Sequence, residues 1–174
     1  MAGSGLIGVA KDNLALEGSP AAFVTGFAEV KLDIETGEFE IIDYLAVTDC
    51  GTVLQPMSLS TQIKGGGVMG FGLGTLERHI YDPQNGLPAN IGFYQAKPPS
   101  YLDVPPEMYA SAVDQPDPSN PVGAKGVGEP PMGAAASAVL CAISDALEGH
   151  LFNRTPVVPD MIIYDCVVYT SPSP

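Results

Sequence analysis

One carboxylate in this sequence stands where it could act on a bound molecule. Glu129 lies within GAKGVGEPPMGAAASA, residues 123–138, between a glycine-rich run and the expected start of a helix. Gly126 and Gly128 can adopt backbone conformations that other residues avoid, and they leave successive N–H groups free to face an anion or a polar ring edge. The helix dipole favours an ionised carboxylate there by about 0.3–1 kcal/mol. Glu129 is therefore either an ordinary helix-capping acid or a general base within reach of a substrate.

The surroundings of Glu129 favour the base. Capping does not call for two flanking glycines, a preceding Lys125 and a double proline, whereas a preorganised base benefits from such a rigid mount. No other catalytic constellation stands out: His79 and His150 lie far apart in the sequence, and no Ser-His-Asp or Cys-His pattern occurs. A small binding domain with a glycine-lined anion pocket is a third interpretation of the same stretch.

A second candidate stretch is rich in glycine. Gln62, Gly66, Gly70 and Gly74 recur at every fourth position, so on a helix they form one stripe, an amide side chain followed by three bare backbone sites. Such a stripe lets another backbone pack closely or a flat ligand approach, and the pattern alone does not choose between the two. Packing explains Gln62 less well than it explains the glycines. The segment GFGLG lacks the spacing and the Lys-Ser/Thr ending of a phosphate-binding loop.

The elements that must position these residues indicate an α+β fold. Residues 21–47 alternate in the manner of a β-hairpin around the turn ETG. A helix is expected over residues 58–77, despite glycines that each lower helicity by roughly 1 kcal/mol relative to alanine. A second helix is expected over residues 131–148, ended by Gly149. We therefore expect an antiparallel hairpin or sheet packed with two principal helices and long Pro/Gly-rich connections.

The other segments are less regular. Residues 82–131 form a long stretch with short strands at best, interrupted by proline-rich pieces. Such a stretch usually serves as a binding surface or lies over another domain, and the second interpretation implies a partner. The segment TPVVPDMIIYDCVVYT, residues 155–170, predicts a closing strand, and the SPSP that follows predicts a loose tail.

Composition and charge exclude several classes of protein. The chain has 174 residues, 45% of them hydrophobic, which suits one core of good size. Seven basic residues against 20 acidic ones give a formal net charge of −13, which disfavours nucleic acid and anionic membranes alike. Cys50, Cys141 and Cys166 fit neither a disulfide framework nor a zinc site, and the first residues carry no export signal or membrane span. We expect a cytoplasmic protein with reduced thiols and no metal-ligand cluster.

Several motifs, in order, resemble those of one family. GAKGVGEPPMGAAASAVLCAISDAL, the upstream TDCGTVLQPMSLSTQIKGGGVMGFGLGTLE and the downstream TPVVPDMI are similar to the C-terminal part of the molybdopterin-binding (large) subunit of the xanthine dehydrogenase/aldehyde oxidase family. The resemblance implies that residues 20–165 are the C-terminal portion of a larger molybdopterin-binding domain. Residues 1–20 would then be an N-terminal segment, and residues 166–174 a tail.

The resemblance implies a molybdenum hydroxylase with a molybdopterin-type molybdenum cofactor. Glu129 matches the family's active-site base in the motif GVGE, and it would take a proton from the oxygen that attacks an electron-poor carbon. Gln62 matches the glutamine that hydrogen-bonds the cofactor. The residues that would line the cofactor are Lys125, Gly126, Val127 and Gly128. The small-molecule substrate would be an N-heterocycle, an aldehyde or an aromatic compound, oxidised with water as the oxygen source.

The resemblance also implies partners. The chain lacks an iron–sulfur motif, an FAD segment and the family's earlier molybdopterin-binding motifs. The cofactor would therefore be shared with the remaining molybdopterin-binding chain, and electrons would leave through 2Fe-2S clusters and FAD on an iron–sulfur subunit and an FAD subunit. Alone, the chain would be inert, and poorly soluble or incompletely folded. An alternative from another class is a noncatalytic structural subunit or remnant that stabilises a partner chain. The sequence departs from the family's usual residues at Gln55, Thr61 and Cys141.

Overall fold

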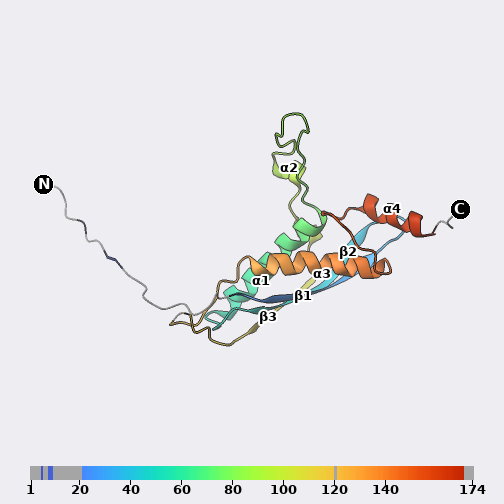
Figure 1. The fold of residues 1–174 in the computed structure, drawn as a ribbon. Helices are drawn as coiled ribbons and strands as arrows, with labels where there is room; N and C mark the ends of the chain where they lie inside the picture. The colour runs from blue at the N-terminus through green and yellow to red at the C-terminus, as the bar shows by residue number, and fades with distance from the viewer. Residues whose placement is uncertain (1–4, 6–7, 10–20, 120, 171–174) are drawn as a thin grey trace.

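A three-stranded sheet covered on one face by two helices forms the body of the molecule (Figure 1). The computed structural model describes residue 5 and residues 8–9, 21–119 and 121–170. The strands, in order across the sheet, are β1 (Val24–Leu32), β2 (Phe39–Asp49) and β3 (Glu107–Val113). The helices on the sheet are α1 (Pro56–Thr75) and α3 (Pro130–Ala146). This arrangement confirms the expected α+β fold.

The hairpin predicted over residues 21–47 is present. β1 and β2 pair antiparallel, with Phe27 opposite Leu45, and burial alternates from residue to residue along β1. The inner face of β1 carries small residues, which lets α3 lie directly on the strand. A Cβ at Gly26 would stand 2.8 Å from the carbonyl oxygen of Ala134.

The third strand comes from the irregular region between the two principal helices. β3 pairs parallel to β2, with Leu45 opposite Tyr109, so the chain must cross the sheet between these strands. The crossing consists of α1 and an arm, residues 78–104, that carries α2 (Phe93–Ala96) and a 3-10 turn (Tyr101–Asp103). The arm projects away from the body (Figure 1), and five of its apolar side chains are 85–97% exposed: Ile91, Phe93, Tyr94, Tyr101 and Leu102.

The two principal helices begin and end within two residues of the predicted bounds. The first is capped by Gln55, whose side-chain oxygen accepts a hydrogen bond from the N–H of Ser58 at 2.5 Å. The second ends where predicted, since Gly149 at φ +88° donates its N–H to the carbonyl of Ser144 at 2.8 Å. No helix in the described part of the chain is long and apolar enough to cross a membrane.

The core lies between the sheet and the two helices. Its largest fully buried aromatic side chains are Tyr44 and Phe71, whose rings meet edge to face with centroids 5.0 Å apart. A Cβ at Gly67 would lie 2.9 Å from Cε1 of Tyr44, so this glycine makes room for the ring. Burial raises the pKa of Tyr44 to about 12, because the phenolate would be formed away from water.

The closing strand predicted over residues 155–170 is wrong. These residues include a helix, α4 (Pro159–Thr170). Pro159 opens it at a position where a missing N–H costs nothing, and Asp160 complements the dipole in the first turn. A short apolar run does not distinguish strand from helix by its periodicity, and here the helix-start signals outweigh the β-branched residues. The SPSP tail and most of residues 1–20 lie outside the described residues.

Candidate functional site

The glycine stripe of α1 is filled by α3. A Cβ at Gly66 would stand 2.8 Å from Cβ of Pro131, and one at Gly70 would stand 2.6 Å from Cβ of Ala135. Gly74 is looser, with the carbonyl oxygen of Ala136 at 3.6 Å. These three glycines therefore serve the contact between the two helices, which settles the choice between packing and ligand approach for them.

The fourth member of the stripe, Gln62, lies beyond this helix contact. It is exposed, and its side-chain oxygen would lie 3.7 Å from a Cβ placed on Gly128. The stripe thus brings the amide of Gln62 beside the loop that carries Glu129. Two stretches that are far apart in the sequence therefore meet at the N-terminal end of α3.

Glu129 immediately precedes α3 but does not cap it through its side chain. Its backbone is already helical, at φ −91° and ψ −37°, and its side chain makes no capping hydrogen bond. Its carbonyl accepts from the N–H of Met132 at 3.0 Å, as the first turn of a helix requires. Within the described residues the exposed carboxylate has no hydrogen-bond or ion-pair partner. The cap interpretation therefore does not account for the Glu129 side chain, in contrast to Gln55 on α1.

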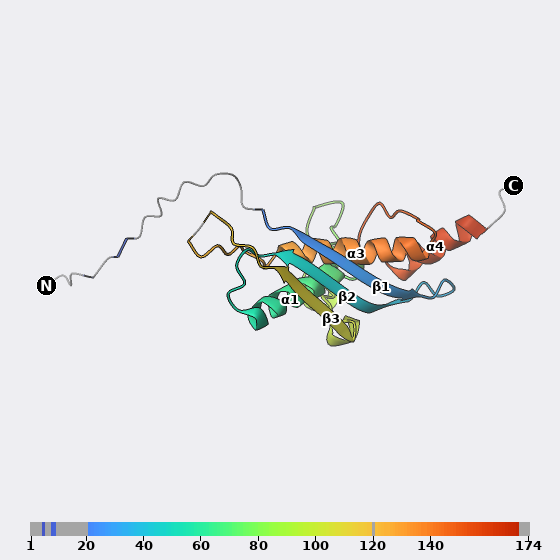
Figure 2. The ribbon, with the colours of Figure 1, turned by 90° about the horizontal axis from the view of Figure 1, so that it is seen from below.

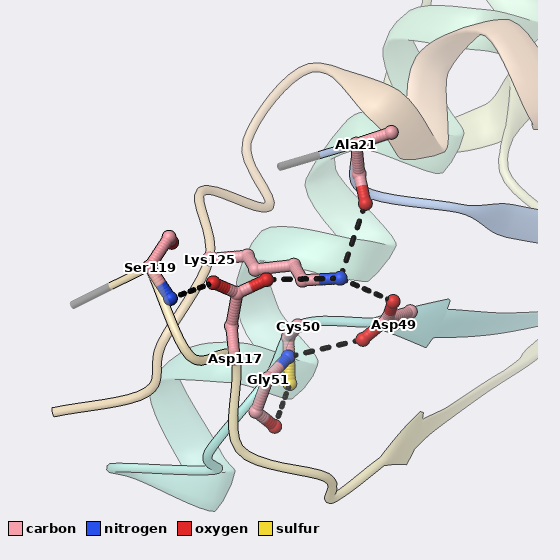
Figure 3. A network of polar contacts seen from close by, with 7 residues as sticks. All are labelled: Ala21, Asp49, Cys50, Gly51, Asp117, Ser119 and Lys125. Atoms are coloured by element: carbon pink, nitrogen blue, oxygen red, sulfur yellow. Dashed lines mark hydrogen bonds and ion pairs between the residues drawn. The ribbon is translucent and has the colours of Figure 1, made fainter. Parts of the chain in front are cut away.

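Lys125 is an anchor of the loop rather than an open cation. Its ammonium lies 2.6 Å from Oδ2 of Asp49 and 3.5 Å from Oδ2 of Asp117, and it donates to the carbonyl of Ala21 at 3.2 Å (Figure 3). The Lys125 side chain is only 14% exposed. The hydrogen bond from Lys125 lowers the pKa of Asp49, and the same bond raises the pKa of Lys125. The ammonium therefore ties the loop to the end of β2.

Backbone hydrogen bonds fix the same end of the loop. Lys125 donates its N–H to the carbonyl of Cys50 at 2.7 Å, and Thr52 donates to the carbonyl of Gly123 at 2.8 Å. Cys50 is buried, and burial raises the pKa of its thiol. Cys50 and Cys141 are both free cysteines, as expected. The DCG segment after β2 thus supports the start of the GAKGVGE loop.

Sequence reasoning missed Asp49 and Asp117 as partners of Lys125. Asp117 also accepts a hydrogen bond from the N–H of Ser119 at 2.7 Å (Figure 3), and hydrogen bonding to Ser119 is the main reason that the pKa of Asp117 is lowered. A signal was present, because Asp49 opens the DCG motif and Asp117 lies in a proline-rich turn. Sequence alone could not pair them, since Asp49 and Lys125 are 76 positions apart.

The middle of the loop is open. A Cβ at Gly126 would meet nothing within 4 Å, and both Gly126 and Gly128 are exposed. Val127 between them is partly buried and packs against the core. The loop is therefore held at Lys125 and Val127, while its glycine backbone is accessible from outside. Beside it, a groove of about 600 Å³ runs between the start of β1 and the first turns of α3, with Pro130 and Gly133 in its lining.

The fold of this chain is that of the molybdopterin-binding domain of molybdenum hydroxylases. It matches quinoline 2-oxidoreductase from Pseudomonas putida 86 with a TM-score of 0.73 at 34% identity, over 79% of this chain and 18% of that one. It matches the aldehyde oxidoreductase of Desulfovibrio gigas with a TM-score of 0.73 at 27% identity, over 84% of this chain and 15% of that one. Residues 10–105, more than half of the chain, match the family model of the molybdopterin cofactor-binding domain. The chain belongs to this family.

Two curated relatives extend the match toward the C-terminus. The 6-hydroxypseudooxynicotine dehydrogenase complex subunit gamma of Paenarthrobacter nicotinovorans is 34% identical over 139 residues, 79% of this chain and 17% of the relative. The putative xanthine dehydrogenase molybdenum-binding subunit of Escherichia coli K12 is 30% identical over 150 residues, 86% of this chain and 20% of the relative. The chain therefore spans a fifth or less of these relatives.

The residues that meet beside the N-terminal end of α3 suit a molybdopterin-type cofactor. Such a group is a polar ring system that needs hydrogen-bond donors and acceptors, and the exposed amide of Gln62 and the open backbone at Gly126 and Gly128 offer both. The described residues hold no group of three or more His, Cys, Asp or Glu side chains that could bind a metal. Glu129 is the free carboxylate at this position.

Proposed function

We propose that this chain supplies the active-site base and part of the molybdopterin pocket of a molybdenum hydroxylase. One observation carries the proposal: Gln62 on α1 and the loop before α3 lie side by side, and the carboxylate of Glu129 on that loop has no partner within the described residues. A structural remnant gains nothing from an exposed acid held this way, whereas a general base must be free to accept a proton.

Each part of the site would have a separate task. When bound, the molybdenum cofactor supplies the two-electron oxidation. The Glu129 carboxylate takes a proton from the water-derived oxygen that attacks an electron-poor carbon. Gln62 donates and accepts hydrogen bonds to position the cofactor, and the backbone of residues 126–128 lines it. Lys125 holds the loop in place through Asp49 and Asp117 rather than touching substrate.

The substrate class and the partners follow from the same proposal. The substrate is an N-heterocycle, an aldehyde or an aromatic compound. The cofactor is shared with the remainder of the molybdenum-binding subunit, because the chain spans a fifth or less of its relatives. Electrons leave through 2Fe-2S clusters and FAD on partner subunits.

Substitution of the base by its neutral isostere tests the proposal. In the assembled enzyme, Glu129→Gln should lower kcat by at least about 100-fold, the usual scale for loss of a general base, while molybdenum content and assembly persist. Glu148→Gln, at the opposite end of α3, is the matched control and should leave kcat unchanged. Unchanged turnover in Glu129→Gln would instead support a noncatalytic structural subunit.

A further inference from the structure

Within the described residues, no helix covers the outer face of the sheet. Both α1 and α3 lie on the other face, and no helix stands in front of the strands when the molecule is seen from below (Figure 2). Phe27, Leu45 and Tyr109 stand in register across the three strands and form an apolar row on this outer face. Phe27 is 58% exposed and Tyr109 is 53% exposed. Exposed aromatic side chains on the two outer strands, on the same face of the sheet, indicate a surface that another chain covers.

A row of carboxylates lies next to the apolar row. Glu29 stands opposite Asp43, and Asp43 stands opposite Glu107. Each lies two positions from the apolar residue of its own strand and therefore on the same face. Like charges directly opposite each other destabilise a sheet. The described residues provide no ion pair for these three groups, and no metal-binding cluster includes them. A row of carboxylates that repel one another and lack counter-ions within the described residues is suited to a cationic partner.

We propose that this outer face binds the remainder of the molybdenum-binding subunit, through a segment that sets apolar side chains on the Phe27 row and Lys or Arg side chains on the Glu29 row. The inference rests on the proposed function, which requires that remainder. Such a remainder would be long enough to supply this segment, because the chain spans only 17–20% of the two curated relatives.

Charge argues against a second copy of this chain as the occupant. The chain has seven basic residues against 20 acidic ones, so a copy would bring few cations to the carboxylate row. On the outer face itself, the one lysine next to the carboxylate row within the described sheet, Lys31, stands opposite Glu40. The cations must therefore come from a different sequence.

Zero-length cross-linking of the assembled molybdenum-binding subunit tests this interface without a mutation. A carbodiimide joins carboxylates only to amines in direct contact, so we expect cross-links from Glu29, Asp43 or Glu107 to lysines of the subunit outside this chain. Added glycine ethyl ester should label these carboxylates less than it labels Glu35 in the exposed β1–β2 turn. Cross-links between two copies of this chain, or full labelling of the row in the assembled subunit, would overturn the proposal.

Charge reversal provides the second test. Glu29→Lys with Glu107→Lys should reduce the yield of assembled subunit at least about tenfold, which corresponds to the loss of one strong interface contact. Glu35→Lys with Glu38→Lys makes the same charge change in the β1–β2 turn and should leave the yield unchanged. Equal yields for the two pairs would contradict the interface. The outcome is separable from that of Glu129→Gln, which should stop turnover and leave assembly intact.

Discussion

The glycine stripe of α1 and the glycines before α3 are alike in sequence and opposite in structure. In the stripe the space is filled, because a Cβ at Gly66 or Gly70 would collide with α3. Gly126, in the loop before α3, has nothing within 4 Å of the same position. A glycine cluster shows that something must come close to the backbone, and only the fold tells whether that neighbour is already within the chain. In the open region, the neighbour we propose is a cofactor.

The largest expected effect on stability is at the glycine stripe of α1, where α3 packs against the helix. Gly70→Ala should lower the free energy of unfolding by about 1–3 kcal/mol, because the new methyl group meets the backbone and Ala135 of α3 and one of the two helices must move. Gly65→Ala is the matched control on the same helix, since a Cβ there has no neighbour within 4 Å, and it should stabilise by up to about 1 kcal/mol. Urea unfolding measures both, and a stabilised Gly70→Ala would show that the helices do not pack this closely.

The next effect is a loss of stability at alkaline pH, which comes from Tyr44, a core residue beside α1. The folded chain holds the phenolic proton of Tyr44 up to a pKa of about 12, whereas the ordinary value is 10.0. Between these values only the unfolded chain releases the proton, so stability should fall by about 1.4 kcal/mol per pH unit as pH rises. Urea unfolding at pH 9 to 11 should show this slope, and Tyr44→Phe should remove it. An unchanged slope in Tyr44→Phe would assign the alkaline loss to other groups.

A smaller effect concerns the anchored end of the open loop. The hydrogen bond from Lys125 lowers the pKa of Asp49 below its ordinary value of 3.8, and hydrogen bonds from Ser119, with a smaller contribution from Lys125, lower that of Asp117. These carboxylates contribute stability above that value, and the contribution disappears as pH falls through their lowered pKa values. Lys125→Met should lower the melting temperature at pH 7 and flatten its decline in acid. If the melting temperatures at pH 7 are equal, Lys125 does not anchor the loop.

The smallest effect on stability is expected where the glycines are open. Gly126→Ala should change the free energy of unfolding by no more than about 0.5 kcal/mol, because the new methyl group meets no protein atom. In the assembled enzyme it should nevertheless lower molybdenum retention about tenfold if the cofactor lies against this backbone. Gly65→Ala again serves as the control and should retain the metal. Full retention in Gly126→Ala would remove the cofactor from this side of the loop.

Much of the fold was predictable because its signals are local. The alternation of residues 21–47 and the glycine stop at Gly149 depend on neighbours within a few positions, and both were confirmed. The strand predicted over residues 155–170 is wrong because a short apolar run fits either a strand or a helix. Pro159 and Asp160, which favour the start of a helix, decide for the helix here. The parallel pairing of β3 with β2 was not predicted, because β3 lies in the region that is irregular in sequence.

The sequence by itself determined the family, the two candidate stretches and the choice of Glu129 and Gln62, because residue type and spacing are written along the chain. Tertiary structure alone decided three further points. It placed the glycine stripe of α1 against α3, it paired Lys125 with Asp49 and Asp117, and it left the Glu129 side chain without a capping hydrogen bond. Each depends on which distant segments become neighbours, and that is set by the burial of the whole core rather than by any local pattern.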